Sequence, residues 1–179
     1  MHFFTREWCE GGVYLIDANV IITAKDSYYR VDQVPEFWAW LVHHGQAGAV
    51  KIPAENWDEV SPGPNDEGNP FYPWRTDRDV RDALLLDEEV DRAVLQQVLD
   101  TGYGENLTED ELANIGGDAF LIAYALAGPD RSVITGEKSE PRRQRANRKV
   151  PDVCRDLDVG CGNTFDLTRA LNFSTSWQP

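Results

Sequence analysis

The chain has 179 residues, of which 41% are hydrophobic, and its formal net charge is −14 at pH 7. This length allows one domain with a real hydrophobic core and leaves little room for two. The acidic balance argues against a protein that binds nucleic acid through a broadly basic surface, unless bound cations or a local basic patch supply the positive charge.

The cysteines and histidines do not indicate a zinc site. The three cysteines are Cys9, Cys154 and Cys161, and neither they nor the three histidines have zinc-ligand spacing. Residues 1–10 lack the cationic region and apolar core of an export signal, and no stretch reaches the roughly 18 apolar residues of a membrane span. We therefore expect a cytoplasmic protein with no membrane contact.

The first predicted strand ends in an acidic residue. Residues 14–16 form a short apolar run, which fits a strand buried on both faces of a parallel sheet, and Asp17 follows. A buried carboxylate there needs a cation or hydrogen-bond donors beside it. Asp17 is a candidate for metal or substrate chemistry, because ligands bind at the carboxyl ends of such strands. Alternatively, Asp17 only caps the helix predicted over residues 18–25.

The next elements bring two more acidic candidates. Pro35 is placed to begin a helix, residues 49–52 predict a second strand, and Pro53 opens a helix that contains Glu55 and Glu59. These two glutamates are one helical turn apart and share a face. Either of them can therefore point back at the strand ends.

A long loop and an acidic helix are predicted next. Residues 61–74 are rich in Pro, Gly, Asn and Asp without periodicity, which predicts a loop. Trp74 at its end either anchors the loop onto the core or stacks on a base. Residues 77–103 have apolar positions at helical spacing, which predicts one long helix with an acidic outer face.

Two further acidic residues stand beside buried elements. A capping box at Thr108 predicts a helix start, and residues 119–127 are apolar nearly all round, which predicts a buried helix. Asp118 precedes this helix and either caps it or faces the strand ends. Residues 131–135 predict a third strand followed by Glu137, which repeats the arrangement at Asp17.

The basic residues gather between Lys138 and Lys149. The arginines of this run are Arg142, Arg143, Arg145 and Arg148. A solvated loop is the simplest interpretation, but the position beside Glu137 favours contacts with an RNA backbone. Beyond the run we expect a helix from residue 150, with Cys154 as a small core residue, a short strand at residue 159 and a last helix over residues 163–171.

The alternation of strands and helices predicts an α/β fold, a three-layer α/β/α sandwich around a mainly parallel sheet. Four candidate carboxylates lie at its edges: Asp17, Glu59 or Glu55, Asp118 and Glu137. Clustered carboxylates repel one another, and hard divalent cations such as Mg²⁺ or Mn²⁺ relieve that repulsion. Such an ion also lowers the pKa of a bound water and stabilises charge at a phosphodiester.

Four segments resemble, in order, the motifs of PIN-domain nucleases. They are residues 15–21, 52–60, 117–123 and 133–137. Residues 37–41 and 149–154 are similar to corresponding pieces of DUF4411, a PIN-like subgroup of bacterial proteins. The resemblance spans most of the chain and implies a single PIN-like domain over residues 1–179.

The resemblance implies a metal-dependent ribonuclease, often the toxin of a toxin–antitoxin pair as in the VapC proteins. The implied metal ligands are Asp17, Glu59, Asp118 and Glu137, with Glu59 preferred because the motif places its acid late. Asn19 and Thr135 would orient ligands or bind a phosphate. The fourth motif differs from the usual PIN form, which has aspartate where Glu137 stands.

The resemblance also implies partners: an RNA substrate, a cognate antitoxin that covers the acidic pocket, and a second copy in a homodimer. Two other classes stay open. A phosphatase of the haloacid dehalogenase type usually has a second aspartate where this chain has Asn19. A non-catalytic PIN-like interaction protein would bind no divalent metal.

Overall fold

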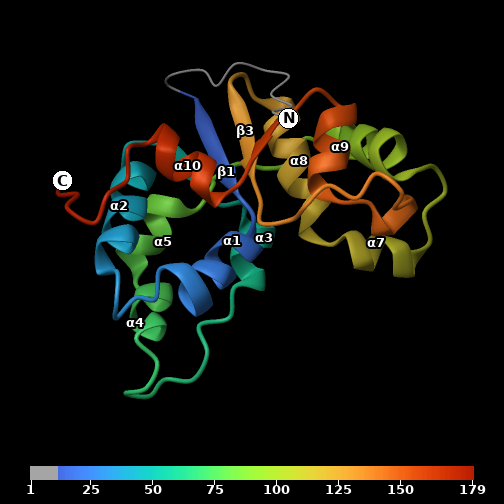
Figure 1. The fold of residues 1–179 in the computed structure, drawn as a ribbon. Helices are drawn as coiled ribbons and strands as arrows, with labels where there is room; N and C mark the ends of the chain where they lie inside the picture. The colour runs from blue at the N-terminus through green and yellow to red at the C-terminus, as the bar shows by residue number, and fades with distance from the viewer. Residues whose placement is uncertain (1–11) are drawn as a thin grey trace.

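The computed structural model describes residues 12–179, with a parallel sheet at its centre (Figure 1); Cys9 lies outside the described residues. The strands are β1 (Val13–Ile16), β2 (Val50–Lys51), β3 (Arg131–Ile134) and β4 (Gly160–Gly162), in the order β2-β1-β3-β4. All neighbouring pairs are parallel, and β1 pairs with β3 from Val13 opposite Arg131 to Ile16 opposite Ile134. The predicted α/β sandwich with a parallel sheet is therefore confirmed.

Helices cover both faces of this sheet (Figure 1). One layer contains α1 (Ala18–Thr23), α2 (Pro35–Gln46), α3 (Ala54–Glu59), α4 (Phe71–Thr76), α5 (Arg78–Leu84) and α10 (Thr164–Ala170). The other contains α6 (Arg92–Gln97), the π-helical segment η2 (Val98–Tyr103), α7 (Glu109–Ile115), α8 (Gly117–Ala127) and α9 (Val150–Asp156). Two hydrophobic cores result, one on each face.

The strands contribute to both cores in alternation, because successive side chains of a strand point to opposite faces. Ile16 and Ile134 pack in the core of α2, and Leu15 and Val133 pack in the core of α8. All four side chains are completely buried. This explains why the carboxyl-terminal halves of β1 and β3 are apolar on both faces.

The order of the strands places a reversal beside β1. The chain passes from β1 to β2 on one side and then returns to β3 on the other side of β1. In open α/β sheets such a reversal marks where ligands bind, outside the carboxyl ends of the strands. Asp17 and Thr135 directly follow the two strands at this point.

Several predicted elements are confirmed at their local signals. Helix α2 begins at Pro35, and α7 begins after Thr108 with both hydrogen bonds of a capping box. Helix α8 is buried along most of its length. Cys154 is fully buried as a core residue.

The single helix predicted over residues 77–103 is wrong. Helix α5 ends at Leu84, and the chain then runs extended beside the end of β2 before α6 begins. The Ile52 N–H donates to the Leu84 carbonyl at 2.7 Å, and the Leu86 N–H donates to the Ile52 carbonyl at 2.9 Å. These tertiary hydrogen bonds hold the segment in an extended conformation, although apolar residues continue at helical spacing in the sequence.

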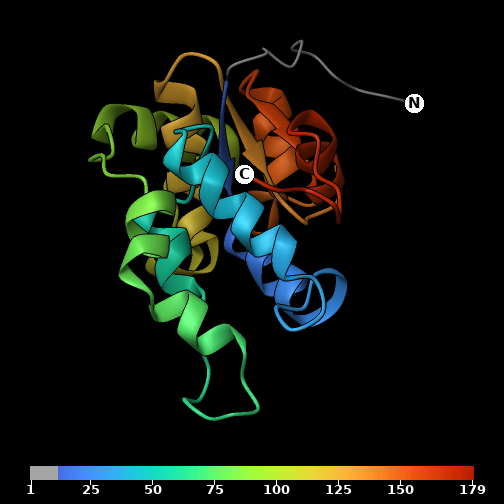
Figure 2. The same ribbon diagram turned by 90° about the vertical axis from the view of Figure 1, so that its left-hand side faces the viewer.

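Two other boundaries differ from prediction. The loop predicted over residues 61–74 ends earlier, because α4 begins at Phe71; residues 61–70 project from the body of the molecule (Figure 2). Trp74 lies on α4 with its ring centroid 4.6 Å from that of Trp38, so it anchors this region onto the core.

The first helix is predicted to end before Asp26, but the π-helical segment η1 (Ala24–Tyr28) continues it.

Within residues 12–179, no helix has the length and apolar character needed to cross a membrane.

Candidate functional site

Asp17 is held in place at the carboxyl end of β1. Its side chain is 3% exposed, and its Oδ2 accepts hydrogen bonds from the Thr135 hydroxyl at 2.7 Å and the Asn19 amide at 2.6 Å. Its Oδ1 accepts from the Asn19 backbone N–H at 3.4 Å, which caps α1. The capping role and a position at the strand ends therefore occur together.

Asn19 and Thr135 connect the ends of β1 and β3. The Asn19 amide donates to the Thr135 hydroxyl at 3.2 Å, and its Oδ1 accepts from the Gly136 N–H at 2.7 Å. The Thr135 hydroxyl also accepts from the Glu137 N–H at 3.1 Å. This network fixes the orientation of the Asp17 carboxylate.

Asp118 and Glu59 meet at the start of α8. Asp118 is the second residue of α8, whose N-cap is Gly116, and the Gly117 N–H donates to Glu59 Oε1 at 3.2 Å. A Cβ on Gly117 would lie only 2.6 Å from this oxygen, so glycine gives Glu59 the space it occupies. The charge of Glu55 instead affects Tyr124 of α8. The pKa of Tyr124 is raised first by burial and next by this charge.

The four predicted carboxylates act on one another electrostatically. Burial first, then the charges of Asp17, Glu137 and Glu59, raise the pKa of Asp118 to about 8. Burial also raises the pKa of Asp17 to about 6, against the hydrogen bonds from Thr135 and Asn19, with further increases from Glu137 and Glu59. The structure therefore gathers these acids at one end of the sheet.

Glu137 is bound on both oxygens by the end of the basic run. Lys149 Nζ lies 2.7 Å from Oε1, and the Val150 N–H donates to Oε2 at 2.8 Å. Within the described chain, no three His, Cys, Asp or Glu side chains are placed so that they could hold one metal ion. Three of the four carboxylates, Asp17, Glu59 and Glu137, accept hydrogen bonds from protein donors.

Two buried polar groups near the carboxylates have no hydrogen-bond partner within the described chain. Asn56 is completely buried with neither side-chain amide atom bonded, and the buried Tyr103 hydroxyl is also unbonded. Asn56 Nδ2 lies 3.3 Å from the position of a Cβ on Gly117, beside Glu59. The pKa of Tyr103 is raised first by burial and then by Asp118. Buried polar groups normally have partners, so these two groups are exceptions among the described residues.

The predicted site residues do not include Asn56, Tyr103 or Lys149. Asn56 is an ordinary helical residue by sequence, and Tyr103 ends an amphipathic segment. Lys149 has one local signal: it is the last cation of the run and directly precedes the Val-Pro start of α9. Their proximity to the acids depends on tertiary packing.

The arginines of the basic run have different surroundings. Arg145 forms two hydrogen bonds with Glu111 and also donates to the Glu105 and Asn106 carbonyls. Arg148 donates to the Gly102 carbonyl and pairs with Asp156. These two arginines therefore bind neighbouring segments of the protein: Arg145 binds the loop before α7 and α7 itself, and Arg148 binds η2 and α9.

Arg142 and Arg143 lie exposed, and Arg143 pairs with Glu140 at 3.0 Å. Asp152 fixes the start of the run, because its buried carboxylate accepts from the Ser139 hydroxyl and from the Glu140 N–H. The predicted RNA contacts of the run stay a prediction, and Arg142 and Arg143 are the arginines best placed for them.

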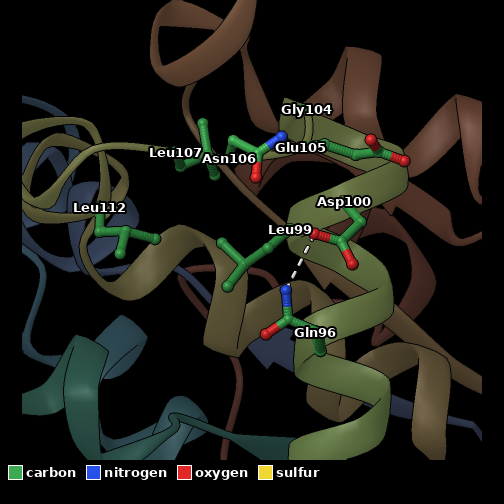
Figure 3. Close-up of a pocket in the computed structure, with 8 residues that line it drawn as sticks. All are labelled: Gln96, Leu99, Asp100, Gly104, Glu105, Asn106, Leu107 and Leu112. Atoms are coloured by element: carbon green, nitrogen blue, oxygen red, sulfur yellow. Dashed lines mark hydrogen bonds between the residues drawn. The ribbon is translucent and has the colours of Figure 1, made fainter.

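Arg145 binds the carbonyls of Glu105 and Asn106, and these two residues border a hollow of about 410 Å³ between η2 and α7 (Figure 3). Its lining residues are Gln96, Leu99, Asp100, Gly104, Glu105, Asn106, Leu107 and Leu112. A second hollow, of about 470 Å³, lies against α2 and is lined by apolar residues such as Trp38 and Trp177. Neither hollow includes any of the four carboxylates.

Comparison with known proteins identifies the family. No curated protein and no solved structure matches the chain. Residues 14–175 match the family model described as a domain of unknown function, DUF4411. The match includes every strand of the sheet except the first residue of β1, and all the carboxylates of the site. The chain therefore belongs to the DUF4411 family.

Proposed function

We propose that this protein is a Mg²⁺- or Mn²⁺-dependent endoribonuclease that hydrolyses RNA phosphodiester bonds in the cytoplasm. The observation that carries the proposal is the buried Asp17 carboxylate, held by Thr135 and Asn19 at the carboxyl end of a parallel strand, with Asp118 close enough that the two charges interact. Strongly perturbed acids at such a position are typical of functional sites. The order of the acidic motifs, which resembles PIN nucleases, supports the same chemistry.

The residues of the site have distinct proposed roles. Asp17, Glu59, Asp118 and Glu137 would hold the cation. A bound Mg²⁺ or Mn²⁺ lowers the pKa of a water and stabilises the charge of a phosphodiester. Thr135 and Asn19 already fix Asp17 through hydrogen bonds of 2.7 and 2.6 Å, so little ordering is needed when a ligand binds.

The surface outside the site suggests how RNA would approach. The chain has a net charge of −14, so the protein needs local positive charge to bind an RNA backbone. Arg142 and Arg143 are exposed on the basic run that follows Glu137 in sequence and would guide the RNA backbone. We further propose that the protein is the toxin of a type II toxin–antitoxin pair, with an antitoxin covering the carboxylates and with a homodimer as the functional unit.

Asp17→Asn tests the activity directly. We expect it to abolish Mn²⁺-dependent cleavage of a panel of fluorescent cellular RNAs, because it removes one cation ligand, while circular dichroism stays unchanged. Asp87→Asn is the matched control, since Asp87 is an exposed acid between α5 and α6. Full cleavage by the Asp17 variant, or cleavage that persists in EDTA, would refute the proposal.

A non-catalytic interaction protein is the second candidate. The observation that favours it is that no three acidic, histidine or cysteine side chains among residues 12–179 are placed to hold one metal ion. Calorimetric titration with Mn²⁺ separates the two, because the interaction protein would bind none. A phosphatase of the haloacid dehalogenase type is disfavoured, because Asn19 supplies no second acid. Its side-chain amide instead donates a hydrogen bond to Asp17 and accepts one from the Gly136 N–H.

A further inference from the structure

We infer that the Lys149 ammonium is a built-in counter-ion of the carboxylate cluster, and that a divalent cation must displace it from Glu137 to gain that carboxylate. The cluster is defined here as Asp17, Glu59, Asp118 and Glu137. The inference rests on the proposed function, because it concerns the cation that the proposed nuclease would bind.

The contacts of Glu137 carry the inference. Lys149 Nζ lies 2.7 Å from Oε1, and the Val150 N–H binds Oε2 at 2.8 Å, so both oxygens are engaged. The side chains of Lys149 and Glu137 are 29% and 20% exposed, so water screens their pairing only in part. Glu137 is therefore held away from any other cation until this pair opens.

The Lys149 charge reaches the rest of the cluster. Its field opposes the increase in the pKa of Asp118. Other cations of the same run have carboxylates outside the cluster: Arg148 pairs with Asp156, and Arg143 pairs with Glu140. Within residues 12–179, Lys149 is the one cation that forms an ion pair with a cluster carboxylate.

The surroundings of Glu59 have unfilled bonding capacity. Glu59 Oε1 accepts only from the Gly117 N–H at 3.2 Å among the described hydrogen bonds, and Asn56 beside it is completely buried with both amide atoms unbonded. A buried amide without a partner is unfavourable and is rare in native proteins. The water shell of a hydrated cation would supply the missing partner. Lys149 thus occupies the cluster at Glu137, while the buried Asn56 amide beside Glu59 is left without a partner.

Lys149→Met tests the inference, because it keeps a chain of similar length and removes the ammonium. In EDTA the variant should unfold at a lower temperature than the wild type, since the clustered acids lose their counter-ion. In calorimetry it should bind Mn²⁺ at least about tenfold more tightly, because no positive charge competes for Glu137. An ion pair with a purely structural role would produce the first change without the second.

Two further variants control the measurement. Lys138→Met removes the same charge from an exposed lysine next to Glu137 in sequence, and its Mn²⁺ affinity should change less than about twofold. Lys149→Gln retains a hydrogen-bond donor without the charge, and it should reproduce the gain in affinity if the methionine variant does not fold.

The outcomes separate this inference from the proposed function. Unchanged or weaker Mn²⁺ binding by the folded Lys149 variant overturns the inference, and so does an equal gain in Lys138→Met, because net charge would then explain it. If the wild type binds Mn²⁺ and Asp17→Asn does not, the proposed cation site stands even when the Lys149 result fails. Absence of Mn²⁺ binding by the wild type overturns both.

Discussion

Replacing Asp118 with asparagine should stabilise the metal-free protein, increasingly so as the pH rises. The pKa of Asp118 is raised from its ordinary 3.8 to about 8 in the folded protein. Below pH 3.8 the carboxyl is neutral in both states, so it does not affect stability. Between these values the unfolded chain has released its proton and the folded chain retains it, so folding stability falls with pH until about pH 8.

The magnitude follows from the same values. Each pKa unit corresponds to about 1.4 kcal/mol, so an increase from 3.8 to about 8 sets a ceiling of about 6 kcal/mol. Asp17 shares the repulsion and the partly buried site can relax, so we expect a gain of about 2 to 3 kcal/mol at pH 8 for Asp118→Asn. At pH 4 the two proteins should be nearly equally stable.

Urea unfolding in EDTA at several pH values between 4 and 9 measures this difference. Asp87→Asn removes an exposed acid between α5 and α6 and should leave the pH dependence of the wild type unchanged. If Asp118→Asn has the same pH dependence as the wild type, or is less stable at pH 8, the electrostatic reasoning is wrong. Excess Mn²⁺ should reverse the order of stability, since the wild type gains more from binding the ion.

Two further substitutions test the positions of Glu59 and Asp17. Gly117→Ala places a Cβ 2.6 Å from Glu59 Oε1, so the carboxylate must move and Mn²⁺ affinity should fall about tenfold in calorimetry; unchanged affinity would remove Glu59 from the site. Thr135→Val removes the hydroxyl 2.7 Å from Asp17 Oδ2 and should lower the free energy of unfolding by about 1 to 3 kcal/mol. The loss should be larger at pH 8 than at pH 5, because the hydroxyl stabilises the ionised carboxylate, and Thr135→Ser should restore most of it.

Local sequence signals predicted the elements that depend on local chemistry. Pro35 and the capping box at Thr108 mark helix starts that the structure has. The short apolar runs predicted parallel strands because burial on both faces leaves no polar positions. The helix predicted through Leu85 is wrong, since hydrogen bonds to Ile52 outweigh helical spacing there. No periodicity in one segment reveals a partner more than thirty residues away.

The acidic residues of the site could be predicted from the sequence, but the residues that support them could not. Asp17 and Glu137 follow strands in the sequence, so the topology of a parallel sheet brings them to one edge. Lys149 looked like another member of a solvated basic run, and its bond to Glu137 depends on how the loop folds back. Asn56 carries no signal at all, because burial of its amide is a property of packing between α3 and α8.

The extended segment after α5 also limits how this protein can associate with others. Strand β2 lies at an edge of the sheet, where unpaired backbone groups invite a strand from another chain. Leu84 and Leu86 bond to both backbone groups of Ile52, the residue after β2, and so occupy the outer side of that edge. A partner that extended the sheet by adding a strand would have to do so beside β4, at the opposite edge.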